Sequence, residues 1–100
     1  MPKIIKANID RLRRDIESLS EFTDPDAYGY TRVSFSHEDR QARNYIRELM
    51  EQEAGLSVHV DSVGNMIGRR EGKLAGPCIM VGSHLDTVPG GGRFDGIVGV

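Results

Sequence analysis

Apolar residues near the start of the chain recur at alternating steps of four and three positions. The repeat consists of Ile5, Ile9, Leu12, Ile16 and Leu19. One face of an α-helix has this spacing, so residues 4–20 are predicted to form an amphipathic helix. We expect its apolar stripe to pack on the body of the domain.

A second helix is predicted after a loop at residues 22–35. Ser36 can accept hydrogen bonds from the free N–H groups of a helix start, and Asp39 follows three positions later, as in a capping box. Arg43 is expected to pair with Asp39 one turn on. Gly55 is expected to end the helix, because glycine takes the left-handed conformation at little steric cost. The predicted buried face consists of Ala42, Tyr45, Ile46, Leu49 and Met50.

Beyond the second helix the pattern changes to alternation, which is typical of strands. Apolar and polar residues alternate over residues 56–60, and residues 66–70 are predicted to return as the second strand of a hairpin after a turn at residues 63–65. Residues 78–81 are continuously apolar, which favours a central strand covered on both faces. Cys78 is therefore expected to be a small core residue. Two helices, a hairpin and a central strand do not yet make a closed α/β layer, so we interpret the chain as a fragment of an α/β fold.

Composition excludes several classes of protein. The 100 residues hold 13 Lys and Arg against 15 Asp and Glu, so no basic surplus points to nucleic acid. The N-terminus lacks the apolar region of a secretory signal, and the apolar run at residues 79–81 is far too short for a membrane span. A single cysteine cannot form an intrachain disulfide. We therefore expect a cytoplasmic protein that binds neither nucleic acid nor membranes.

Residues 82–96 contain the candidate chemistry. The strand predicted at residues 78–81 would deliver His84 to its C-terminal end, where α/β sheets place their ligand sites. Asp86 lies two residues on, so in extended backbone it projects from the same face and could orient a metal-bound imidazole. Glycines at residues 90–92 let the chain double back and bring Asp95 to the same place. The alternative is a hydrogen-bonded core histidine with two aspartates that cap turns.

The complete string favours the metal interpretation. Residues 82–96 read Gly-Ser-His-Leu-Asp-Thr-Val-Pro-Gly-Gly-Gly-Arg-Phe-Asp-Gly. This string resembles the metal-binding signature of the hydantoinase/carbamoylase amidase family, which includes N-carbamoyl-L-amino-acid hydrolases, allantoate amidohydrolases and β-ureidopropionases. Residues 29–36 and 61–65 resemble other segments of the same family. The family belongs to a superfamily with dinuclear zinc aminopeptidases, carboxypeptidases and aminoacylases.

The resemblance implies a role for each candidate residue. His84 would bind one metal, Asp95 would bridge two metals, and Asp86 would be the catalytic-site carboxylate that holds His84. The implied cofactors are two divalent ions, for which zinc, manganese, cobalt and nickel all suit histidine and carboxylate ligands. The implied fold is the N-terminal part of a three-layer αβα catalytic domain over residues 1–100, with the rest of that domain and a lid domain absent from this chain.

The resemblance also implies a substrate class. Only eight residues separate Asp86 from Asp95, a spacing typical of carbamoylases, whereas peptide-cleaving members usually have a longer stretch. We therefore expect small-molecule substrates such as N-carbamoyl amino acids or related ureido compounds. A homodimer is expected separately, because an open sheet edge and apolar residues favour association. The chain alone is expected to be inactive. The alternatives are an aminoacylase or dipeptidase with the same metal centre, and a non-catalytic fragment that associates with itself.

Overall fold

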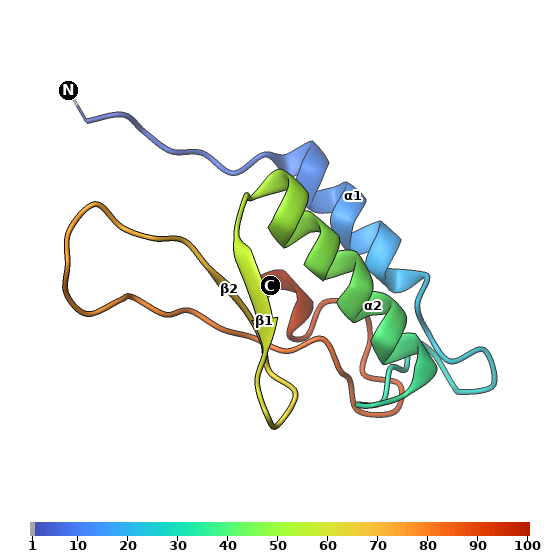
Figure 1. The fold of residues 1–100 in the computed structure, drawn as a ribbon. Coiled ribbons are helices and arrows are strands. Elements are labelled where there is room, and N and C mark those ends of the chain that lie inside the picture. Colours follow the sequence, from blue (N-terminus) through green and yellow to red (C-terminus); the bar gives the residue numbers. More distant parts are fainter. Residues whose placement is uncertain (1) are drawn as a thin grey trace.

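The computed structural model describes residues 2–100, in which two helices are followed by a hairpin. Helices α1 (Ile9–Ser20) and α2 (His37–Glu48) lie side by side and run in opposite directions (Figure 1). Strands β1 (Ser57–Val60) and β2 (Met66–Arg69) form an antiparallel pair, in which Val60 lies opposite Met66. A short 3₁₀ turn, η2 (Ile97–Gly99), follows near the end of the chain.

Helix α1 begins five residues later than predicted, at Ile9. The Asn8 side chain accepts a hydrogen bond from the Arg11 N–H at 3.0 Å and caps the helix there. Ile5 is 92% exposed and makes no core contact that would extend the helix toward residue 4. The predicted start was wrong because the apolar repeat extends past the residue that caps the helix.

Helix α2 begins as predicted. The Ser36 hydroxyl accepts a hydrogen bond from the Asp39 N–H at 3.1 Å, and the Asp39 carboxylate accepts one from the Phe35 N–H at 3.0 Å. The predicted pair between Asp39 and Arg43 is wrong, because Arg43 donates to the Gly64 carbonyl at 2.6 Å instead. A π-helical turn, η1 (Leu49–Glu53), extends α2, and Gly55 follows with a φ of +65°, as expected of a helix end.

The core lies between the two helices. Its buried members are Leu19 from α1, Ala42 and Ile46 from α2, and Ile97 from η2. Leu85 packs against this cluster, so the segment that carries the candidate site is anchored to the core on two sides. Burial of a leucine or isoleucine side chain stabilises a fold by about 1.5–3 kcal/mol, and burial of the smaller Ala42 contributes less. The predicted buried face of α2 is confirmed in Ala42 and Ile46, with partly buried Tyr45, Leu49 and Met50 beside them.

The hairpin turn is held by Asp61. Its carboxylate accepts hydrogen bonds from the Val63 N–H at 3.1 Å, the Asn65 N–H at 2.8 Å and the Asn65 side-chain amide at 2.9 Å. These bonds, led by that from the Asn65 side chain, lower the pKa of Asp61. The predicted hairpin is confirmed.

The predicted central strand at residues 78–81 is not formed. Among residues 2–100 the sheet contains β1 and β2 alone, and the chain beyond β2 extends away from it (Figure 1). Ile79 is 97% exposed and Val81 90% exposed, and Cys78 is exposed rather than in the core. A strand needs a neighbour to satisfy its N–H and C=O groups, and no described segment takes that place. The α/β class is correct, with the hairpin as the sheet.

The length and apolar content of a helix decide whether it could cross a membrane. None of the helices within residues 2–100 is long and apolar enough to cross a membrane.

Candidate metal site

Gly96 brings the segment that carries Asp95 against His84. The Ser83 hydroxyl donates to the Gly96 carbonyl at 2.6 Å. A Cβ on Gly96 would lie 2.5 Å from the His84 carbonyl oxygen and 2.6 Å from the His84 ring carbon Cε1, and Gly96 has a φ of +77°. Only glycine fits this position, because it has no Cβ and adopts positive φ freely. Ile97 is buried in the core and fixes the segment on its other side.

The His84 ring lies between the two aspartates. Its Nδ1 atom is 2.9 Å from the Asp86 main-chain carbonyl and 3.4 Å from the Asp86 carboxylate atom Oδ1. Its Nε2 atom is 3.8 Å from the Asp95 carboxylate atom Oδ2. A carbonyl oxygen only accepts, so this contact favours a hydrogen on Nδ1, and Nε2 is the ring nitrogen on the side of Asp95.

The contact with Asp86 differs in one detail from the expectation. Asp86 lies beside the imidazole, as its spacing from His84 predicts, but its main-chain carbonyl is the closer acceptor and its carboxylate lies farther off. Either acceptor fixes the ring orientation and the tautomer. The role of Asp86 as the carboxylate that holds a metal-bound histidine stays a prediction.

The positions of His84 and Asp95 fit a shared ion. Two donor atoms bound to one tetrahedral zinc ion at about 2.0–2.2 Å each lie about 3.3–3.6 Å apart. The observed separation of 3.8 Å needs an approach of only a few tenths of an ångström. The side chains of His84 and Asp95 are 50% and 76% exposed, so the cluster is open to solvent. Within residues 2–100, no three histidine, cysteine, aspartate or glutamate side chains converge as a metal-binding group.

The glycine-rich turn is held by the loop at residues 29–36. The Gly90 N–H donates to the Thr31 hydroxyl at 2.8 Å, and the Gly92 N–H donates to the Tyr30 carbonyl at 3.3 Å. Thr31 is 3% exposed, so the bond that its hydroxyl accepts is partly shielded from water. Sequence reasoning connected this loop with the site only through the family resemblance, because its contacts join residues far apart in the chain.

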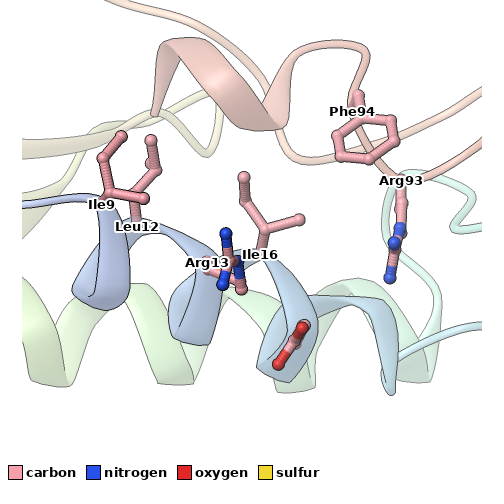
Figure 2. A pocket seen from close by; sticks show the side chains of 7 residues that line it. Ile9, Leu12, Arg13, Ile16, Arg93 and Phe94 are labelled. Carbon is pink, nitrogen blue, oxygen red and sulfur yellow. The ribbon is translucent and has the colours of Figure 1, made fainter.

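A groove lies beside the candidate site but is separate from it. It has a volume of about 310 Å³ and runs between α1 and the segment at residues 93–94. Figure 2 shows Ile9, Leu12 and Ile16 of α1 on one side and Phe94 on the other. None of the three candidate site residues lines it. His37 and His59 are exposed and lie outside the site, as expected.

Comparison with known structures supports the fold class. The chain superposes on a hydantoinase/carbamoylase family amidase from Burkholderia ambifaria with a TM-score of 0.84 and 35% sequence identity, over 98% of this chain and 24% of that one. This likeness places the chain in the α/β class and on the architecture of an amidase. No family model matches the sequence.

Comparison with curated proteins identifies the relatives. The chain is 47% identical to ureidoglycolate hydrolase from Oryza sativa subsp. japonica over 91% of its length, and 44% identical to N-carbamoyl-L-amino-acid amidohydrolase from Pseudomonas sp. (strain NS671) over 98%. It is therefore related to the hydantoinase/carbamoylase amidases, which confirms the resemblance seen in residues 82–96. The chain spans 19% and 24% of the length of these two relatives.

Proposed function

We propose that this chain forms part of a metal-dependent amidohydrolase that cleaves non-peptide C–N bonds of N-carbamoyl amino acids or related ureido compounds. The observation that carries the proposal is the 3.8 Å approach of His84 Nε2 to the Asp95 carboxylate, with Nδ1 engaged by Asp86. The substrate class is supported by relatives named ureidoglycolate hydrolase and N-carbamoyl-L-amino-acid amidohydrolase.

His84 and Asp95 are the residues that would hold the metal, with Asp95 as the bridging ligand. When bound, two divalent ions supply Lewis acidity and an activated water to such a site. The Asp86 carbonyl, 2.9 Å from Nδ1, would hold the hydrogen on that atom and so leave the Nε2 lone pair available as a ligand. The open position of the cluster leaves room for a small substrate and for further ligands.

The isolated chain of 100 residues is proposed to lack turnover. Catalytic zinc sites usually have three protein ligands, whereas residues 2–100 bring together His84 and Asp95 with no third metal-binding side chain in the group. A positioned general base contributes a factor of about 10²–10⁴ in rate, and the cluster contains no carboxylate free of the two proposed roles. Metal binding by the chain alone should therefore be weak.

The test is hydrolysis by the intact protein that carries this chain. With zinc or manganese, an N-carbamoyl-L-amino acid should release its amino acid, and His84→Ala should abolish the release. His59→Ala is the matched control, because His59 is exposed on β1 and should leave the rate unchanged. Faster cleavage of a dipeptide would replace the proposal with the aminoacylase or dipeptidase alternative. Full activity in His84→Ala would end the metal-site proposal.

We also propose that the protein is a homodimer. Apolar surface supports association: Ile79, Met80 and Val81 are 97%, 75% and 90% exposed in a run of three residues. Light scattering after size-exclusion chromatography tests this directly. A monomer at all concentrations would contradict it, and a dimer without activity in the intact protein would favour a non-catalytic, self-associating role.

A further inference from the structure

Arg32 is a buried cation in the loop that holds the glycine turn. It is 4% exposed, and its guanidinium donates to three main-chain carbonyls rather than to a carboxylate. Burial lowers its pKa, while Asp39 and Asp86 oppose this effect. A buried guanidinium is costly unless its donors are satisfied, so these three bonds define where the surrounding carbonyls must lie.

The three carbonyls belong to two different parts of the fold. Nη1 of Arg32 donates to the carbonyls of Leu19 at 2.9 Å and Phe22 at 2.8 Å, at the C-terminal end of α1. A positive charge is favourable at that end of a helix. Nε of Arg32 donates to the carbonyl of Leu85 at 2.8 Å, which lies between His84 and Asp86 in the chain. The side chain thus ties the candidate site to the helix end.

The main chain of Arg32 adds two bonds to the same segment. Its N–H donates to the Thr87 hydroxyl at 2.9 Å, and its carbonyl accepts from the Thr87 N–H at 2.8 Å. Asp86 is therefore fixed on both sides, through Leu85 before it and Thr87 after it. The Asp86 carbonyl in turn lies 2.9 Å from Nδ1 of His84.

We propose that Arg32 is a positioning residue for His84. By holding residues 85–87 it aims the Asp86 carbonyl at Nδ1 and leaves Nε2 turned toward Asp95. Lysine could not replace it, because one ammonium group cannot reach Leu85 on the Nε side and the end of α1 on the Nη1 side together. This proposal rests on the proposed function in one respect only, namely that Nε2 of His84 binds a metal ion.

The test combines a readout that needs no metal with one that does. In the intact wild-type protein that carries this chain, ¹H–¹⁵N spectra of the His84 side chain should show the hydrogen on Nδ1. Arg32→Met and Arg32→Lys should shift the ring to a mixture of tautomers and lower the affinity for Co²⁺ by about 10–100-fold, the usual effect of losing a group that orients a metal ligand. Unchanged tautomer and affinity in Arg32→Met would overturn the proposal.

Arg43→Met is the matched control. Arg43 also donates to a main-chain carbonyl, that of Gly64 at 2.6 Å, but it supports the hairpin turn rather than the site. Its loss should change stability without changing the His84 tautomer or Co²⁺ affinity. If Arg43→Met changes the His84 tautomer and the Co²⁺ affinity as much as Arg32→Met does, then Arg32 has only a general structural role. That result would overturn the proposal.

A second pair of variants covers the case in which Arg32→Met fails to fold. Thr87→Val removes the hydroxyl that accepts from the Arg32 N–H and should shift the His84 tautomer, whereas Thr87→Ser keeps the hydroxyl and should restore it. Equal spectra in these two variants would overturn the proposal. If His84→Ala leaves Co²⁺ affinity unchanged, the proposed metal site is wrong. The tautomer of His84 in the Arg32 and Thr87 variants would still show whether Arg32 positions the ring.

Discussion

Gly96→Ala tests whether close packing brings Asp95 to His84. The added Cβ would lie 2.5 Å from the His84 carbonyl oxygen and 2.7 Å from Nδ1. These distances are too short for any carbon contact, so the segment that carries Asp95 must move away from the ring. The substitution therefore separates the two proposed ligands without changing either of them.

The cost follows from two terms. A side chain at positive φ costs about 1–2 kcal/mol, and an extra methyl group in filled space costs about 1–3 kcal/mol. The sum is about 2–5 kcal/mol, and about 1.4 kcal/mol is a tenfold change in binding. The strain at positive φ is the same with and without metal, so only the methyl clash that returns when Asp95 approaches His84 should weaken Co²⁺ binding, by at least about 5-fold for about 1 kcal/mol.

Gly92→Ala separates strain from contact. Gly92 has a φ of +85°, but nothing lies within 4 Å of a Cβ at that position. It should therefore lose only the strain term, about 1–2 kcal/mol. In Co²⁺ titrations followed by NMR, Gly92→Ala should bind as the wild type does, and Gly96→Ala should bind more weakly than both. Equal affinities in the two variants would refute the packing argument.

Three further predictions concern the supporting fold. Ser36→Ala should lower the free energy of unfolding by about 1 kcal/mol in urea, because it removes the α2 cap; an unchanged midpoint would argue against that cap. Ile46→Ala should cost about 2–5 kcal/mol, since Ile46 is 7% exposed, whereas Ile79→Ala, at 97% exposure, should cost nothing measurable. The pKa of Asp61 is lowered in the folded state, so its contribution is present above about pH 3.9 and lost as the pH falls through the lower, folded value. Amide exchange at Asn65 should accelerate over that range, and Asp61→Asn should remove the dependence.

The features predicted correctly from the sequence depend on short-range interactions. The Ser36 cap, the stop at Gly55 and the hairpin at residues 57–69 involve residues a few positions apart. The nearness of His84 and Asp86 follows from their spacing in extended backbone, and the approach of Asp95 from the glycines before it and at position 96. Local chemistry is enough for the cap, the helix stop and the hairpin, whereas the site also depends on the contacts of Thr31 and Arg32 with residues 85–92.

The features predicted wrongly depend on partners elsewhere in the chain. An apolar run such as residues 78–81 predicts burial, but a strand forms only where another strand pairs with it. Arg43 lies one turn after Asp39, yet the Gly64 carbonyl, 21 residues away, receives its hydrogen bond. Arg32 gives no local signal, because it bonds Leu19 across 13 residues and Leu85 across 53.

The central claim is that His84 and Asp95 bind a common metal ion. X-ray absorption spectroscopy of the cobalt-loaded intact protein tests this claim most directly. The account predicts imidazole and carboxylate scattering at about 2.0–2.2 Å, with the imidazole signal reduced in His84→Ala and unchanged in His59→Ala. A coordination shell made only of oxygen, or an imidazole signal as strong in His84→Ala as in the wild type, would contradict it.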